Sequence, residues 1–348
     1  WIYYLVGFLM SSVSRFFFPA QNAVLPLIIP DKDDLLAANG LMQIVQTAGF
    51  LIGPALAGFS IGLWGAQVAF LADSGTYLVS AVAILTMKVP RTTAGRPATG
   101  SQLATVWAEM RDGVVYLFHS RTMVGVLLCL SVVQLGIGAI HVIWVPFMQR
   151  TFGLGAEGLG AVDTAQGIGM ALGALGVGLA ARFRKKDLAG WSILFIGLMI
   201  ALVGLAPPFS LANLLPGFEA GADMTRLNVG QRLVYMPLLL LLYSMLLGVA
   251  LVPAQSSLMT MMQLAVPDLK RGRVGSALNA LTTAAGLVSM AAAAAAGEVL
   301  ALRMIYFVAG LITMAAGVVG LFVLQEPEAG EDEPLLGQTP GVADLLPD

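Results

Sequence analysis

The sequence predicts an all-α polytopic membrane protein, from its composition, the length of its apolar blocks and the placement of its basic residues. Of the 348 residues, 58% are hydrophobic and only 11% are charged, whereas soluble domains average about 25% charged residues. So few charges cannot cover a water-facing surface. We therefore expect the lipid bilayer to be the main solvent of the chain, and the formal net charge of −2 gives no indication of a nucleic-acid partner.

The apolar blocks have the length of membrane-crossing helices. About 20 helical residues cross a hydrocarbon core of roughly 30 Å. The candidate spans, nine in all, are 1–29, 38–62, 66–87, 122–147, 159–181, 190–206, 236–264, 275–297 and 303–324. Uninterrupted runs such as "ALGALGVGLA" lack the alternating polarity of barrel strands. The 40 glycines predict close helix packing, because small residues let helix backbones approach each other in lipid.

Basic residues concentrate in every second connection, which predicts the orientation of the spans. These residues are Lys32, Lys88, Arg91, Arg96, Arg111, Arg121, Arg182, Arg184, Lys185, Lys186, Lys270, Arg271 and Arg273. The intervening connections hold Arg150, Arg226, Arg232 and Arg303. The positive-inside rule makes the first set cytoplasmic, and the C-terminus with it. Aromatic residues at span ends fit an interfacial belt: Trp1, Trp64, Trp144, Trp191 and Tyr235.

Three segments lie outside the predicted spans. Residues 88–121 form a cytoplasmic linker that contains an amphipathic helix, which we expect on the inner membrane surface. Its apolar side consists of Leu103, Val106, Trp107, Met110, Val114 and Leu117. Residues 207–235 form an outer loop long enough for a small helix, and the acidic, proline-rich segment 325–348 is predicted to be disordered.

An internal repeat relates the first span to the seventh. Pro-Ala-Gln occurs at 19–21 and 253–255, and Ala-x-Asn-x-Leu at 37–41 and 277–281. Duplicated halves are typical of secondary transporters, which bind substrate between the repeats near the midplane. If the first three spans match the last three, spans four to six need counterparts before Trp1. We therefore predict a twelve-span protein that begins upstream of this chain.

Three segments carry a resemblance to a known family. "RFFFPAQNAVLPLIIPDKDDLLAANGL" (15–41), "WAEMRDGVVYLFHSRTM" (107–123) and "GFLIGPALAG" (49–58) resemble exporters of the major facilitator superfamily, in the branch of macrolide-efflux and enterobactin-exporter proteins. The third segment is similar to the antiporter motif of the superfamily's fifth helix. Gly49, Gly53, Pro54 and Gly58 are in place, and Ala57 stands where glycine is usual.

The resemblance implies a major facilitator-type helical bundle in a bacterial plasma membrane, with nine of its twelve transmembrane helices in this chain. Residues 1–87 would then be the remainder of the N-terminal half-bundle, and residues 122–324 the C-terminal half-bundle of six spans. The segment 178–190 resembles the degenerate second copy of the family's basic loop, which implies a cytoplasmic gate. Its basic residues are Arg182, Arg184, Lys185 and Lys186. An equal alternative to a gate is that these basic residues only set the orientation of the spans, under the positive-inside rule.

The glycine-proline segment also has a physical interpretation of its own. Glycines four residues apart open a groove on one helix face, and Pro54 removes a backbone donor and bends the helix. Such a segment favours a pivot or a tight seal against a neighbouring helix. The matching stretch of the other half, 289–298, has no Gly-Pro pair, an asymmetry typical of exporters. A generic packing helix is the alternative.

Polar residues inside the spans are the candidates for the substrate and proton pathway. An unpaired charge at the bilayer centre costs about 2.5 kcal/mol or more, so Arg15 should face the bundle interior or a wet cavity. An ion pair or snorkelling is its alternative. Asp73 and Asp163 are candidate proton carriers. The alternative for both is a structural role in helix capping or hydrogen bonding. The uncharged candidates are Gln21, Asn22, Gln134, Gln166 and Gln255, and His141 is expected at the interface.

The resemblance implies secondary active export of small molecules, drug, macrolide or siderophore-like, by proton antiport with alternating access. A small amphipathic substrate and protons are the expected partners. We expect no enzyme activity, cofactor or metal, because the sequence holds no P-loop, HExxH, GxSxG or Cys/His cluster. Transport of lipid or lysophospholipid, a non-transporting scaffold or receptor, and a membrane-embedded enzyme stay open as alternatives.

Overall fold

The computed structural model describes residues 1–29, 31–87, 102–180, 183–207, 210 and 234–326. The linker 88–101, most of the loop 207–235 and the tail from residue 327 onward lie outside the described residues. The described part is a bundle of helices. They are α1 (Ile2–Ile28), α2 (Lys32–Thr86), α3 (Gln102–His119), α4 (Arg121–Phe152), α5 (Ala156–Ala180), α6 (Lys185–Leu205), α8 (Leu238–Ala265), α9 (Asp268–Ala296) and α10 (Leu302–Val323).

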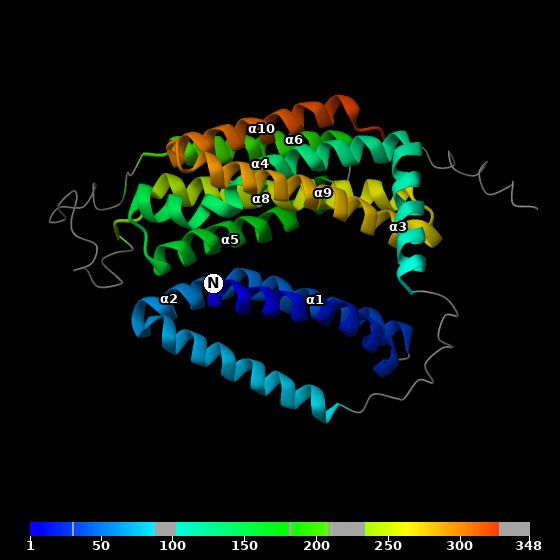
Figure 1. The fold of residues 1–348 in the computed structure, drawn as a ribbon, viewed down its shortest axis with the longest axis horizontal. Helices are drawn as coiled ribbons and strands as arrows, with labels where there is room; N and C mark the ends of the chain where they lie inside the picture. Colours follow the sequence, from blue (N-terminus) through cyan, green and yellow to red (C-terminus); the bar gives the residue numbers. More distant parts are fainter. Residues whose placement is uncertain (30, 88–101, 181–182, 208–209, 211–233, 327–348) are drawn as a thin grey trace, which may run out of the picture.

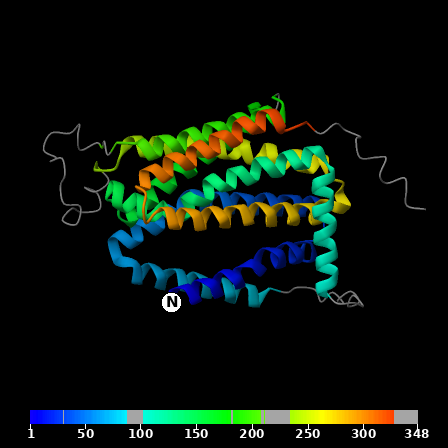
Figure 2. The same ribbon diagram turned by 45° about the horizontal axis from the view of Figure 1, so that its top comes forward.

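The helices form two unequal parts (Figure 1). Helices α4 to α10 make a bundle whose long axes run roughly side by side, and α1 and α2 lie along one side of it. The core of buried apolar side chains lies within the bundle. Figure 2 shows that α3 runs across one end of the bundle, at a steep angle to the other helices.

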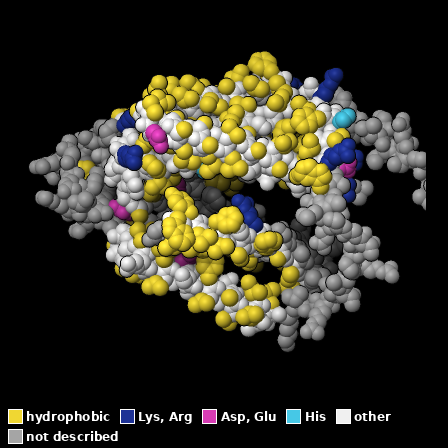
Figure 3. All heavy atoms as spheres, in the orientation of Figure 1, with side chains coloured by type: hydrophobic (Ala, Val, Ile, Leu, Met, Phe, Trp, Pro, Cys, Tyr) yellow, Lys and Arg dark blue, Asp and Glu magenta, His cyan; other side chains and the backbone are white. Residues whose placement is uncertain are grey.

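The helices fall on the predicted spans. Among the described residues, helical segments long and apolar enough to cross a membrane are Ile52–Thr86, Arg121–Phe152, Lys185–Leu205, Leu238–Ala265, Lys270–Ala296 and Leu302–Val323, six in all. Helix α1 contributes a shorter apolar segment, Tyr4–Phe17. Hydrophobic side chains cover the visible flank of the bundle, and most charged side chains gather near its two ends (Figure 3). The all-α membrane fold is therefore confirmed.

Helix α2 contains the boundary between the second and third predicted spans. The helix folds back on itself at Gly65, whose φ of 82° and ψ of 162° are not helical. Glycine adopts this backbone conformation readily because it has no Cβ. The turn therefore lies in the predicted gap between spans 38–62 and 66–87, at a glycine, the residue type that this backbone conformation favours.

Replacing Gly65 with alanine is expected to destabilise the protein by about 1–3 kcal/mol, because a Cβ strains this region of backbone space. The measurement is the temperature at which half of the detergent-solubilised protein leaves its monodisperse chromatographic peak. Gly75→Ala is the matched control: Gly75 is helical in the same element, and a Cβ there meets no described atom within 4 Å. Equal transition temperatures for the two variants would contradict the strain argument.

Glycines bring the bundle helices into backbone contact, as their abundance predicts. A Cβ on Gly310 of α10 would lie 2.7 Å from the Cα of Ala201 on α6, and one on Gly317 would lie 2.6 Å from the Cα of Leu194. Real side chains do not fit at such distances. The α6–α10 pair is therefore closed by small residues, as helix interfaces in lipid usually are.

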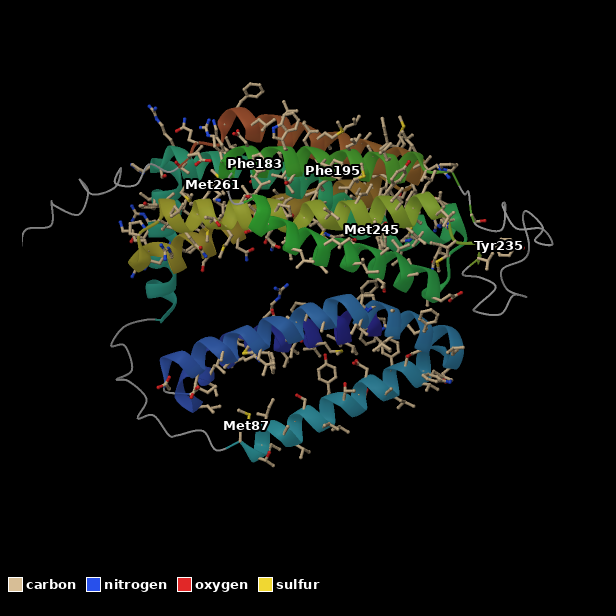
Figure 4. All side chains as sticks on the ribbon, turned by 180° about the vertical axis from the view of Figure 1, so that it is seen from behind. Met87, Phe183, Phe195, Tyr235, Met245 and Met261 are labelled. Atoms are coloured by element: carbon tan, nitrogen blue, oxygen red, sulfur yellow. The ribbon has the colours of Figure 1, made fainter. Side chains whose placement is uncertain are left out.

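Glycines also bring the backbones of α5 and α8 into contact. Gly169 of α5 faces the backbone of Met245 on α8, and Gly248 of α8 faces the backbone of Gln166 on α5. Figure 4 labels Met245 on the flank of α8. The figure also places Tyr235 at one end of the bundle, with Phe183 and Met261 toward the other, so successive connections alternate between the ends.

Helix α3 corresponds to the predicted amphipathic helix, but part of the apolar side that was expected on the membrane packs against the protein. Leu117 is fully buried and Val114 packs against the same core, so these residues meet protein and not the membrane surface. Trp107 stays exposed, while the side chains of Leu103 and Val106 are not described. The apolar periodicity was correct, but it does not distinguish a lipid partner from a protein partner.

Polar contacts fasten α3 to the end of the bundle. The Tyr116 hydroxyl donates a hydrogen bond to the Ala265 carbonyl oxygen at 2.9 Å. Arg273 of α9 forms an ion pair with Asp112 at 3.2 Å. Both partners of that pair are about half exposed, so it contributes orientation more than stability.

Candidate functional site

The antiporter-like segment meets the bundle at α5. Gly58 of α2 is buried, and a Cβ there would lie 2.8 Å from the Ala156 carbonyl oxygen and 3.1 Å from the Cα of Gly160. A Cβ on Gly160 would in turn overlap the carbonyl oxygen of Pro54. The Pro54–Gly58 turn therefore packs backbone to backbone on α5.

The first part of that segment does not share this contact. Gly49 is exposed, and a Cβ on Gly49 or Gly53 meets no described atom within 4 Å. Helix α2 packs against the bundle chiefly through α5, and a hollow opens beside this contact between the two parts (Figure 3). The α2–α5 contact is thus narrow and formed by small residues.

A cavity of about 290 Å³ lies inside the bundle between α4, α5, α6, α8 and α10. We name it the Asp163 cavity. Its polar lining residues are His141, Trp144, Asp163, Gln166, Ser244 and Tyr306, and the rest of its wall is Ile, Leu and Val. The structure therefore brings the candidates Asp163 and Gln166 together, and it adds His141, which was expected only at the interface.

A second cavity, of about 640 Å³, adjoins the first. We name it the Gln255 cavity, because the candidates Gln134 and Gln255 both line it. Ile137, Ile196 and Leu251 belong to the walls of both cavities. The other polar groups of the Gln255 cavity come from Asn279 and Thr282, and its wall is otherwise apolar.

Like Ser244, Tyr306 is a buried polar residue of the Asp163 cavity. Its side chain is 2% exposed, and its hydroxyl has no hydrogen-bond partner among the described residues. The ring stacks on Phe147, with the centroids 4.1 Å apart. Asp163 lines the same cavity. An orphaned buried hydroxyl is uncommon in proteins and indicates a functional or solvent-filled site.

Three pathway candidates are not among the described residues that line either cavity. Arg15 of α1 and Asp73 of α2 are exposed, and Gln21 of α1 is partly exposed. Asn22 is in α1, but its side chain is not described. The candidates were chosen together because each is a polar residue inside a predicted span, but the fold separates them. Among the described residues, the two cavities hold only the candidates from α4, α5 and α8.

The expected gate loop is described only in part. Arg182 lies outside the described residues. Arg184 caps the start of α6 and pairs loosely with Asp187, at 3.9 Å between exposed side chains. The backbone N–H of Lys186 donates to the Glu326 carboxylate at 3.2 Å, and Lys185 begins α6. These contacts hold the α6 terminus, and the role of this loop as a gate stays a prediction.

Sequence reasoning missed Tyr306 and placed Trp144 differently. Trp144 was expected in an interfacial belt, whereas it packs against the core and lines the Asp163 cavity. The signal available for Tyr306 was a hydroxyl-bearing ring one turn inside an apolar span. Its proximity to Asp163 depends on how α5 and α10 cross the bundle, which no local pattern encodes.

Comparison with known proteins identifies the family. The model of the Major Facilitator Superfamily matches residues 1–222. Macrolide efflux protein A of Enterococcus faecalis is 22% identical over 212 residues, which are 60% of this chain and 63% of that protein. The same-named protein of Streptococcus pyogenes is 22% identical over 60% of this chain and 50% of its own length. The chain thus spans about half to two-thirds of these relatives.

Longer matches extend through the second half of the chain. The multidrug efflux pump Tap of Mycolicibacterium fortuitum is 22% identical over 326 residues, covering 90% of this chain and 71% of that protein. With a family model matching well over half of its residues and a multi-helix apolar fold, the chain belongs to the major facilitator superfamily of membrane transporters.

Proposed function

We propose that the protein exports small amphipathic molecules from the cytoplasm by alternating access, coupled to proton entry. The observation that carries this proposal is the backbone contact of Gly58 on α2 with Gly160 on α5. It puts an antiporter-like segment at the junction between α2 and the bundle. A junction of small residues can close tightly and part again, because little side-chain packing has to be rebuilt.

The cavities supply the rest of the argument. A mostly apolar space with a few polar groups suits small amphipathic ligands, and the two adjoining cavities have this composition. Asp163, half-buried in the bundle, is the carboxylate that we assign to proton coupling or substrate charge. The relatives named for macrolide and multidrug efflux come from bacteria, which supports export over uptake and a bacterial plasma membrane. The placement of the basic residues supports a cytoplasmic C-terminus.

The proposal is tested by efflux from cells that express the protein. The probes are Nile red, an uncharged fluorescent amphiphile, and ethidium, a cation. We expect one or both to leave loaded cells faster than from cells with an empty vector, and a protonophore to abolish the difference. Efflux that persists at full rate with the protonophore would contradict proton antiport. Rates equal to the vector control for both probes would contradict export and favour a scaffold.

A further inference from the structure

We propose that α3 is a strap across one end of the Gln255 cavity, which ties the α4 wall of the cavity to the end of α8 and so controls the width between them. This inference rests on the proposed function, because it takes the Gln255 cavity as part of the ligand space. The strap is fastened by Asp112 and Tyr116, and neither is among the described residues that line the cavity.

The Gln255 cavity separates two helices that make little direct contact. One wall comes from α4, and another comes from α8, with Leu258, Met259 and Met262 among its residues. Helix α4 packs chiefly on α9 and α10, whereas α8 packs chiefly on α5 and α6. Direct packing between α4 and α8 therefore does little to fix the distance across the cavity.

Helix α3 is attached to both of these walls. It leads directly into α4 at Ser120, whose hydroxyl caps α4 by accepting a hydrogen bond from the N–H of Met123. Its Tyr116 hydroxyl donates to the carbonyl oxygen of Ala265, the last residue of α8, at 2.9 Å. Ala265 follows the cavity residue Met262 by about one helical turn. The hydrogen bond thus acts on the end of the α8 wall.

The corner between α8 and α9 is stiffened by Arg271. Its guanidinium donates to the carbonyl oxygens of Val266 at 3.2 Å and Gln263 at 2.6 Å. Carbonyl groups at a helix end lack partners within the helix, so these bonds hold the end of α8 to the start of α9. The ion pair between Asp112 and Arg273 therefore acts on the same corner as the Tyr116 hydrogen bond.

Helix α3 also touches the backbone of α9, at Gly113. A Cβ on this residue would overlap the carbonyl oxygen of Arg273 and would lie 3.2 Å from the Cβ of Ala277. Ala277 is fully buried, and the next residue, Leu278, lines the cavity. Since α3 runs across this end of the bundle (Figure 2), it braces the α9 wall from outside.

The attachment of α3 can open without unfolding the bundle. Both partners of the Asp112–Arg273 pair are about half exposed, and such pairs are weak. Lys270 lies over the Tyr116 ring at 5.3 Å, a modest attraction at an accessible site. Among the α3 side chains that the structure describes, only Leu117 is a buried apolar one. Elements with few buried apolar contacts open at a lower free energy than the core.

The first measurement follows the distance between α4 and α8 in the purified full chain. Nitroxide labels are placed on Leu128→Cys and Leu264→Cys, both at exposed positions, whereas Cys129 is fully buried and should stay unlabelled. Pulsed electron paramagnetic resonance gives the distance distribution. Tyr116→Phe and Gly113→Ala should each add a longer-distance component, because the first removes the bond to α8 and the second pushes α3 off α9.

The second measurement is the affinity of the same variants for Nile red. A ligand that touches both walls binds less tightly when they separate, so Tyr116→Phe should weaken binding roughly twofold to tenfold, as expected for one hydrogen bond. Tyr77→Phe makes the same change at an exposed tyrosine of α2. Gly272→Ala is the control for Gly113→Ala, because a Cβ there meets no described atom within 4 Å. Neither control should alter distance or affinity.

Three outcomes would overturn the strap. They are unchanged distances in both Tyr116→Phe and Gly113→Ala, longer distances with unaltered Nile red affinity, and an equal response in the controls. Absence of Nile red binding by the unaltered protein would also overturn it. Distances are measured without transport, so the two proposals fail separately. The expected distance shift without cellular efflux would refute export alone, and proton-driven efflux with unchanged distances would refute the strap alone.

Discussion

Replacing both Gly310 and Gly317 with alanine is expected to prevent stable assembly of the bundle. Each Cβ would fall within 2.8 Å of α6 backbone or Cβ atoms, and backbone atoms cannot rotate away as a flexible side chain can. Overpacking typically costs about 1–3 kcal/mol per site. The two residues are two helical turns apart and meet different partners, so their effects should add. The sum, about 2–6 kcal/mol, is a large part of the roughly 5–15 kcal/mol by which a typical domain is stable.

The measurement is the yield and the thermal transition of the detergent-solubilised protein. The double variant should give little monodisperse protein, and each single variant should show a lowered transition temperature. Gly176→Ala is the matched control, because a Cβ at this helical glycine of α5 meets no described atom within 4 Å. A double variant that purified and melted like the control would show that the α6–α10 contact accepts both added methyl groups without loss of stability.

The helices were predictable because each apolar run has its own physical reason to be a helix in lipid. Backbone groups in a bilayer must be satisfied within the segment, so length and hydropathy located α6, α8 and α10 to within a few residues. The turn at Gly65 followed from the short gap between two long apolar runs. These are local properties, and they need no knowledge of what each helix touches.

The sites were less predictable because they depend on helix crossings. Asp163 was a candidate from its place in a span, but its neighbour Tyr306 comes from a helix far along the chain. The glycines of α5 predicted close packing without naming the partner, and the structure divides them between α2 and α8. The sequence of α3 likewise left open whether Leu117 would meet lipid or protein.

Replacing Gly160 with leucine is expected to abolish transport while leaving the bundle folded. The residue faces the Pro54 carbonyl oxygen and the Cα of Gly58, so a side chain there would force α2 away from α5. A cost of about 1–3 kcal/mol in the closed arrangement shifts a two-state equilibrium roughly five- to 150-fold. The packing of α6, α8 and α10 does not involve this position, so the thermal transition of the bundle should change little.

Efflux rate and thermal transition are therefore measured on the same preparations, with Gly160→Ala as a graded change and Gly176→Leu as the control. The control puts an identical side chain on the same helix, where a Cβ meets no described atom within 4 Å. We expect efflux to fall in the order Gly176→Leu, Gly160→Ala, Gly160→Leu. If Gly160→Leu exported probe as fast as the control, tight closure of α2 on α5 would not be part of the transport cycle. If it lost its fold together with its transport, the contact would serve assembly, because a gating contact can be lost without loss of the fold.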